Sequence, residues 1–258
     1  MEMTSYAPGT PSWVDLGNPD LAGARDFYSR LFGWTMEIGP PEAGNYTMCM
    51  LRGRSVAGLG PQMNPDLPPF WASYVSVADC DTSTAKATEL GATVVAEPMD
   101  VMTVGRMSVV IDPTGAAISL WQPRDHPGAG LVNEPGSFAW TELMTTDVEA
   151  STAFYAGLFG WVAEGQSGGD MPYTEFKLDG RSVCGMMPKP PTMPAEAPST
   201  WGVYFAVEDA DAAAAKVAEL GGSVMMEPTD IEPGRFAVVA DPYGASFNVM
   251  KLKEGLGG

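Results

Sequence analysis

Two copies of one pattern run through this sequence. Trp13 and Asp15 precede the segment FYSRLFGW, and Trp140 and Glu142 precede FYAGLFGW in the second half of the chain. The segments GRSVAG and GRSVCG repeat at the same spacing, and DPTGAA and DPYGAS repeat at nearly the same spacing. Because self-similarity of this kind marks a repeated structural unit, the chain is expected to fold as two similar halves.

The repeat also sets the expected domain boundaries. We place the first domain at residues 7–124, a linker at 125–133 and the second domain at 134–252. The linker region reads PRDHPGAGLVNEPGS, and clusters of Pro and Gly are typical of connections between folded units. With 258 residues, of which 45% are hydrophobic, the chain is long enough to bury a large core.

Each half has the same predicted order of secondary structure. A strand, an amphipathic helix and further strands precede a Pro-rich loop, and the order strand, helix and three strands follows it. Asn18 is the expected N-cap of the first helix, Thr146 with Glu149 is a capping box in the second copy, and Asp79 caps the helix between them. The sequence therefore predicts an α+β fold with four βαβββ units. It leaves open which of these units pair with each other.

The charge of the chain limits its partners. It carries 32 acidic and 14 basic residues, a net charge of -18. Nucleic acids and anionic membrane surfaces both require clustered Lys and Arg, so neither is an expected partner. The sequence contains no run of about 20 apolar residues, so we expect no membrane span. The first residues do not resemble a signal peptide. The three cysteines lack CxxC spacing and are typical of reduced thiols, so we expect a cytoplasmic protein.

The order βαβββ, the FY..LFGW helix end and the DP.G turn resemble the vicinal oxygen chelate (VOC) superfamily. This superfamily includes glyoxalase I, bleomycin-resistance proteins and extradiol dioxygenases, and the resemblance covers about residues 10–252. Two fused copies are similar to the two-domain actinobacterial type labelled "hydroxylase" or antigen. The resemblance implies two tandem glyoxalase/bleomycin-resistance-type domains with curved mixed sheets. It does not by itself imply one activity, because this fold hosts many chemistries.

The resemblance also implies where a metal would bind. The positions that carry His or Glu in the metal enzymes of the superfamily correspond here to Trp13, Ala72, Ser119, Trp140, Gly202 and Asn248. Trp, Ala and Gly offer no side-chain ligand, and Ser and Asn are weak ligands for a transition metal. The only histidine, His126, lies in the linker, where we expect an exposed or locally bonded residue. We expect no metal and no cofactor, and a Mg²⁺ or Ca²⁺ site made of carboxylates is the remaining alternative.

In place of a metal, the resemblance puts an aromatic lining on the concave face of each sheet. Side chains alternate along a strand, so every second residue faces the same cup as Trp13 or Trp140. The candidate ligand-binding residues are Trp13, Tyr74, Ser119, Trp121, Trp140, Tyr204, Asn248 and Met250. Flat rings with a few polar groups favour a planar organic ligand. Core packing is the alternative for these residues, and Trp71 and Trp201 are expected to pack or to form a lid.

Asp15 and Glu142 are the candidate catalytic residues. A carboxylate facing an apolar cup should have a raised pKa, which suits a general acid or base. The alternative is a structural role, in which the carboxylate binds Arg106, Arg235 or backbone N–H groups.

The leading functional hypothesis is metal-independent binding of a small planar or aromatic organic molecule, as in the sequestration or handling of an antibiotic or secondary metabolite. The first alternative is a tailoring hydroxylase or lyase that uses Asp15 or Glu142 as general acid/base. The second is a silent interaction protein whose cups are filled by side chains. The expected partner is a small organic ligand, with no nucleic acid and no membrane, and the expected state is a monomer or homodimer.

Overall fold

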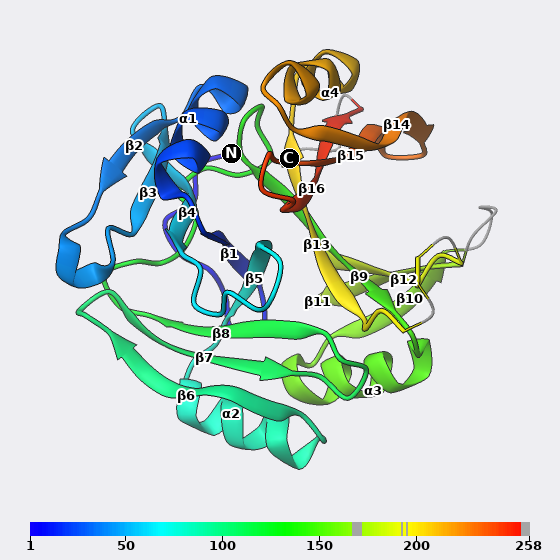
Figure 1. Cartoon of the computed structure of the whole chain (residues 1–258). Helices are drawn as coiled ribbons and strands as arrows, with labels where there is room; N and C mark the ends of the chain where they lie inside the picture. The colour runs from blue at the N-terminus through cyan, green and yellow to red at the C-terminus, as the bar shows by residue number, and fades with distance from the viewer. Residues whose placement is uncertain (167–171, 192, 195, 254–258) are drawn as a thin grey trace.

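The computed structural model describes residues 1–166, 172–191, 193–194 and 196–253. The first half forms one eight-stranded sheet in the order β2-β3-β4-β1-β5-β8-β7-β6 (Figure 1). Its strands are β1 (Pro11–Asn18), β2 (Thr35–Ile38), β3 (Thr47–Leu51), β4 (Arg54–Pro61), β5 (Phe70–Ser76), β6 (Thr93–Val101), β7 (Gly105–Ile111) and β8 (Ala117–Pro123).

The second half repeats this sheet in the order β10-β11-β12-β9-β13-β16-β15-β14. Its strands are β9 (Phe138–Thr145), β10 (Val162–Gln166), β11 (Tyr173–Leu178), β12 (Arg181–Pro188), β13 (Thr200–Ala206), β14 (Ser223–Ile231), β15 (Gly234–Ala240) and β16 (Ser246–Leu252). In each sheet the two units of one half meet at an antiparallel pair, β1 with β5 and β9 with β13. The two units that are consecutive in the sequence therefore share a sheet, which fixes the pairing.

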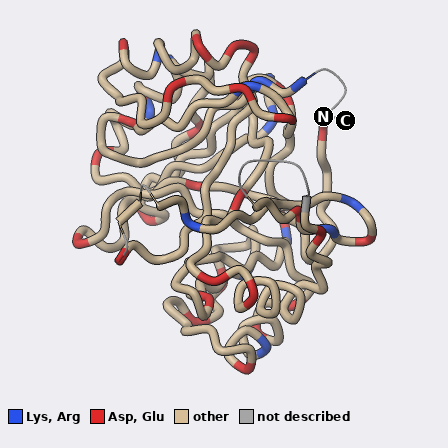
Figure 2. Tube along the Cα trace, turned by 90° about the vertical axis from the view of Figure 1, so that its right-hand side faces the viewer, with Lys and Arg blue, Asp and Glu red and all other residues tan. Residues whose placement is uncertain are grey.

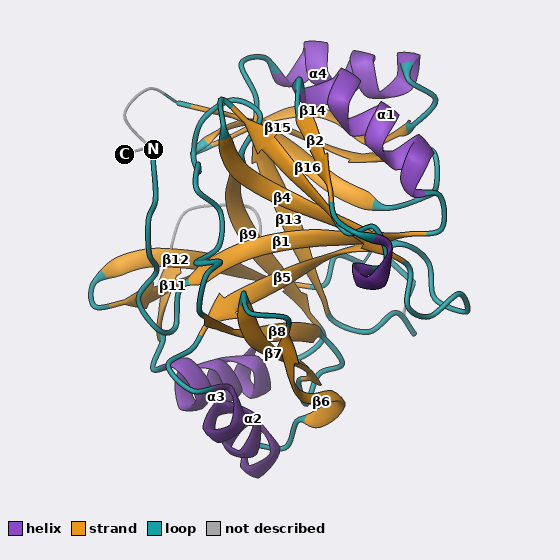
Figure 3. Cartoon of the chain, turned by 90° about the vertical axis from the view of Figure 1, so that its left-hand side faces the viewer, coloured by secondary structure: helices purple, strands orange, loops and turns teal. Residues whose placement is uncertain are grey.

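In the described part of the chain, four α-helices cover the sheets: α1 (Leu21–Phe32), α2 (Cys80–Glu89), α3 (Val148–Phe159) and α4 (Ala210–Glu219), with a short 3₁₀ turn η1 (Pro41–Ala43). Figure 3 shows α1 with α4 at one end of the molecule and α2 with α3 at the other, with strands between them. Each pair joins a helix of one half to a helix of the other. Two hydrophobic cores follow this arrangement, and each combines residues of both halves.

Two of the predicted helix caps were wrong by one or two residues. The N-cap of α1 is Asp20, whose carboxylate accepts from the N–H groups of Ala22 and Gly23. Asn18 instead accepts from the N–H of Asp20 and donates to a carboxylate of the other half. Asp147, not Thr146, caps α3 in the same way. A carboxylate is as good a cap as Asn or Thr and stands closer to the helix, so it takes the position. The cap Asp79 of α2 is confirmed.

The repeated FY and DP.G segments bind each other across the two halves. The Tyr28 hydroxyl donates to Asp241 at 3.1 Å, and the Tyr155 hydroxyl donates to Asp112 at 2.8 Å. The indole N–H groups of Trp71 and Trp201 donate to these same tyrosine oxygens at 3.1 and 2.9 Å. Both tryptophans are buried, so they are packing residues and not a lid.

Each DP.G aspartate also holds its own turn, because its second oxygen accepts from nearby backbone N–H groups such as that of Ala116. Trp34 and Trp161 also connect the two halves. The indole N–H of each donates, at 2.7 Å, to a backbone carbonyl of the other half. Buried polar groups that find partners across the halves make this interface specific as well as apolar.

Acidic residues are spread over the whole trace (Figure 2). An evenly acidic surface keeps protein molecules apart in solution. Among the described residues, no helix combines the length and the apolar character needed to cross a membrane.

Candidate ligand-binding cups

A hydrogen-bonded set of four side chains lies on one face of the first sheet. The hydroxyl groups of Tyr46 and Tyr74 both donate to Oδ2 of Asp15, each at 3.0 Å. The indole N–H of Trp13 donates to the Tyr46 oxygen at 3.1 Å. Val14 and Leu16, which alternate with these residues on β1, are fully buried on the opposite face. The alternation predicted for β1 is therefore present, and one side of the strand carries the polar set.

The second sheet carries the same set at the equivalent positions. Trp140 donates from its indole N–H to the Tyr173 hydroxyl at 3.2 Å, and Tyr204 donates to Oε1 of Glu142 at 2.9 Å. Tyr173 also hydrogen-bonds the Glu142 carboxylate. The unit Trp–Tyr–carboxylate–Tyr is thus repeated in both halves, with Asp in one and Glu in the other.

The GRSVAG and GRSVCG segments supply the space for the first tyrosine of each set. A Cβ on Gly58 would overlap the Tyr46 hydroxyl, and a Cβ on Gly185 would overlap the Tyr173 hydroxyl. The final glycine of each segment therefore allows a tyrosine ring to lie across β4 or β12 and reach the carboxylate.

Sequence reasoning missed Tyr46 and Tyr173. Their separation along the chain is the same as that between Trp13 and Trp140, so the repeat contained the signal.

The other predicted ligand residues lie beside these sets. Ser119 is in register with Tyr74, which is in register with Trp13, and the Trp121 ring centroid lies 6.4 Å from that of Tyr74. In the second sheet Asn248 is in register with Tyr204, and Met250 follows on the same face of β16. The structure thus brings each half's candidates together on one face. Of the eight, the Trp140 side chain is the only one that is not buried.

The predicted arginine partners of the carboxylates were wrong. Arg106 pairs with Asp81 at 2.7 Å and with Asp100 at 3.1 Å, and Arg235 makes the matching pairs with exposed carboxylates of the second half. A guanidinium at the surface stays hydrated while it pairs, whereas entering the cup would require removing its water. Tyrosine hydroxyls bring hydrogen bonds to the buried carboxylates without a second charge.

Burial decides the protonation of the two cup carboxylates. It raises the pKa of Asp15 to about 6, and the hydrogen bonds from Tyr74 and Tyr46 offset part of that effect. Burial likewise raises the pKa of Glu142. Both tyrosines of the first cup bind Oδ2 of Asp15, and no described residue donates a hydrogen bond to its Oδ1. That oxygen can accept from a ligand hydroxyl, or donate to a ligand when the carboxyl is protonated.

The linker histidine packs over the first cup. The His126 ring lies edge-on to Trp13, with ring centroids 4.5 Å apart, and 5.9 Å from the Trp121 ring. Its carbonyl accepts from the Trp121 indole at 2.9 Å, and its N–H donates to the Val104 carbonyl at 3.1 Å. Burial lowers the pKa of His126 to about 4, so the ring is neutral near pH 7. Of the two expected states, exposed or locally bonded, the structure shows the second.

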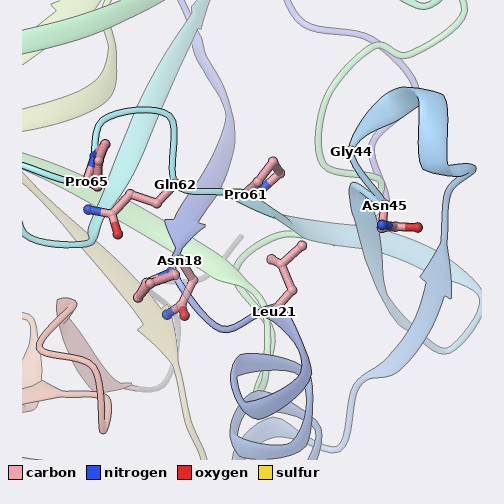
Figure 4. Close-up of a pocket in the computed structure, with 8 residues that line it drawn as sticks. Asn18, Leu21, Gly44, Asn45, Pro61, Gln62 and Pro65 are labelled. Carbon is pink, nitrogen blue, oxygen red and sulfur yellow. The ribbon is translucent and has the colours of Figure 1, made fainter.

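A separate groove of about 510 Å³ lies at the ends of β1 and β4, outside the cups. Figure 4 shows the side chains of Asn18, Gln62 and Asn45 around it, with Pro61 and Leu21 between them. Its lining of amides and prolines contains no charged group, and sequence reasoning did not single it out.

Comparison with known proteins identifies the fold. The Glyoxalase/Bleomycin resistance protein/Dioxygenase superfamily matches residues 10–120 and 137–249. The CFP32 protein of Mycobacterium tuberculosis, named as a putative glyoxylase, is 43% identical over 261 residues, covering 96% of this chain and 97% of that protein. The anthracycline biosynthesis protein DnrV of Streptomyces peucetius is 37% identical over 268 residues, covering 98% and 97%.

Solved structures agree on the fold at low identity. The Mn(II)-bound glyoxalase of Novosphingobium aromaticivorans has a TM-score of 0.64 at 16% identity, covering 95% of this chain and 83% of that one. The 2,3-dioxygenase LapB of Pseudomonas sp. KL28 has a TM-score of 0.65 at 12% identity, covering 96% and 93%.

The side chains of this chain do not fit a metal of the kind that the first of these structures holds. Trp13, Ala72 and Ser119 stand at the positions that the superfamily resemblance gives to metal ligands in the first half. Within the described part of the chain, no three His, Cys, Asp or Glu side chains come close enough together to hold a metal ion. These side chains therefore support no reaction step that runs through such an ion.

Proposed function

Because this chain belongs to the Glyoxalase/Bleomycin resistance protein/Dioxygenase superfamily, we propose that it binds a planar aromatic secondary metabolite in a cup of that fold, without a metal. The observation that carries the proposal is the Trp–Tyr–carboxylate–Tyr set in each half, whose tryptophan stands at a position that the superfamily resemblance gives to a metal ligand. Supporting it, two relatives that align over nearly the whole chain at 37% identity, DnrV and DauV, are named as anthracycline biosynthesis proteins.

The set matches the chemistry of such a ligand. An indole face stacks on a planar ring system, and this packing brings little polar selectivity by itself. The carboxylate supplies the selectivity, because two carboxylate oxygens have more acceptor sites than two tyrosines occupy and can also bond a phenol or hydroxyl on the ring edge. The two tyrosines hold the carboxylate in one orientation, so the ligand meets a fixed acceptor and less conformational entropy is lost on binding.

A second candidate function is catalysis, favoured by the raised pKa of Asp15 and Glu142. A carboxyl group that titrates closer to neutrality can hold or accept a proton during a reaction. The enzyme would be a tailoring lyase with one of these residues as general acid/base, because a carboxyl group moves protons and supplies no oxidant for a hydroxylase reaction. The variant Glu142→Gln separates the two functions. If the protein is an enzyme, turnover of the variant falls by ~10²–10⁴-fold while ligand affinity is nearly unchanged. If the protein only binds, ligand affinity and its pH dependence change, and no turnover is found.

The binding proposal is tested with quinizarin, a planar dihydroxyanthraquinone that is neutral near pH 7. Titration into the metal-free protein in the presence of a chelator should give a saturable change in the dye's visible absorbance, with one dye bound per chain. Absence of saturable binding, or binding that appears only when a divalent metal is added, would contradict the proposal. Incubation with the dye followed by mass spectrometry reports any product.

A further inference from the structure

We infer that the two cups are unequal, and that the ligand occupies the second cup, around Trp140, while the linker closes the first. This inference rests on the proposed function and assigns its site. Its basis is a difference between the two cups in the side chains that surround the tryptophan.

The rings of Trp13, Trp121 and His126 close the first cup. Trp121 and His126 both meet the hydrogen-bonded set edge-on, and the Trp13 side chain is only 4% exposed. Trp121 is in register with Ser76 on β5, and Met250 is in register with the equivalent Ala206 on β13, so Met250 is the counterpart of Trp121. Phe236 is in register with Met250, and its counterpart in the first sheet, in register with Trp121, is Met107, so the aromatic ring lies on β15 in the second cup and on β8 in the first. Met250 has three flexible bonds and can adapt to a ligand.

The His126 ring has no counterpart in the second cup, because His126 is the only histidine of the chain. In agreement with this, Trp140 is partly exposed, whereas Trp13 is buried.

The linker is held too firmly to act as a loose lid on the first cup. Both backbone groups of His126 are hydrogen-bonded, to Val104 and to Trp121. Its Nε2 is buried and has no hydrogen-bond partner among the described residues. Removing this nitrogen from water costs free energy, which the contacts of the ring must offset. The next linker residues continue the attachment, since Ala129 donates to the Ser12 carbonyl at 2.8 Å. A ligand entering the first cup would have to break these contacts.

One position beside the second cup is acidic where its counterpart beside the first cup is apolar. In the first sheet, Asp15 is in register with Gly58 and then Met48 on the neighbouring strands. In the second sheet, Glu142 is in register with Gly185 and then Glu175. A carboxylate, with Lys177 3.9 Å away, thus replaces a thioether beside the site. It adds an acceptor for a ring system that bears hydroxyl or amine donors.

The inference is tested by quinizarin titration, followed by the dye's own absorbance so that every variant is read in the same way. Trp140→Leu should weaken binding at least tenfold. Met250→Trp, which gives the second cup the counterpart of Trp121, should weaken it by a similar factor. His126→Ala opens the first cup and should leave the affinity within twofold. Circular dichroism and Tm establish that each variant is folded, and Trp140→Phe replaces the leucine variant if that one is not.

The outcomes separate the two proposals. If the wild-type protein binds no dye, the proposed function and the site assignment both fail. If it binds dye, and His126→Ala changes the affinity tenfold while Trp140→Leu leaves it unchanged, only the choice of cup is overturned. Acrylamide quenching gives an independent check, because removing Trp140 should lower the quenchable share of the tryptophan fluorescence.

Discussion

Replacing Asp15 with Asn should stabilise the protein at pH 7.5 and slightly destabilise it near pH 4. The variant keeps the shape of the side chain and an oxygen that can accept from Tyr46 and Tyr74, but it removes the titrating group. Because the pKa of Asp15 is raised, the wild-type folded state holds its proton more tightly than the unfolded state does. Stability then falls as the pH rises from the pKa of Asp15 in the unfolded state to its pKa in the folded state. The loss is complete above the folded-state pKa.

The magnitude follows from the size of that window. The pKa rises from 3.8 to about 6, a difference of about 2 pH units. At about 1.4 kcal/mol per unit, the buried charge costs about 3 kcal/mol of stability above pH 6. The amide group of the Asn variant brings N–H donors that the cup does not satisfy, which removes about 1 to 2 kcal/mol of the gain. We therefore expect the free energy of unfolding to increase by about 1 to 2 kcal/mol at pH 7.5. At pH 4.0 the wild-type carboxyl is mostly protonated, so there is little charge cost for the variant to remove. The unsatisfied amide then lowers the free energy of unfolding of the variant by about 1 kcal/mol relative to wild type.

Urea unfolding of both proteins at pH 4.0 and 7.5 measures the effect. Taking the difference between variant and wild type at each pH removes the contribution of His126, which is common to both. Asp66→Asn, in an exposed loop, is the control and should change neither value by more than about 0.5 kcal/mol. If Asp15→Asn destabilises the protein equally at both pH values, the tyrosine hydrogen bonds outweigh burial and the reasoning is refuted.

Three further predictions concern the interface, the cup and the metal. Tyr155→Phe removes the donor to buried Asp112 and should lower the free energy of unfolding by about 2 to 3 kcal/mol, so an unchanged urea midpoint would contradict the cross-domain role of this tyrosine. Gly58→Ala should displace the Tyr46 hydroxyl and lower stability by about 1 to 3 kcal/mol, whereas Gly165→Ala, with no atom near its added Cβ, should have little effect; equal losses would contradict the steric argument. Dialysis against a chelator should leave Tm unchanged, and a fall of several degrees would reveal a stabilising metal.

The repeat was enough to predict the elements of the fold, and local alternation was enough to predict which residues of β1 and β5 share a face. The caps of α1 and α3 were misplaced because Asp, Asn and Thr compete within one short stretch and local rules do not rank them. The pairing of the four units depends on contacts distant in sequence, which no local pattern encodes. The same is true of Tyr28 and Asp241, which lie 213 residues apart and meet only when both halves are folded.

The candidate site was predicted in part. The repeat singles out Trp13 and Asp15, but their tyrosine partner at position 46 lies on another segment of the chain, and no local pattern connects it to the carboxylate. The arginines were chosen by charge alone, although hydration keeps an arginine at the surface when a neutral donor can reach the carboxylate. His126 was assigned to a loop by composition. Its position over the cup depends on indole surface that the rest of the fold provides.

The reciprocal tyrosine–aspartate contacts have a consequence for how such a chain arose. Tyr28 of the first half binds Asp241 of the second, and Tyr155 of the second binds Asp112 of the first. Contacts that are the same in both directions define an isologous interface, the kind that closes a two-fold symmetric homodimer. A single ancestral half would have carried both residues, so two identical copies could have closed this interface before any linker joined them. After fusion, the symmetric interface held the halves together while the two cups were free to diverge.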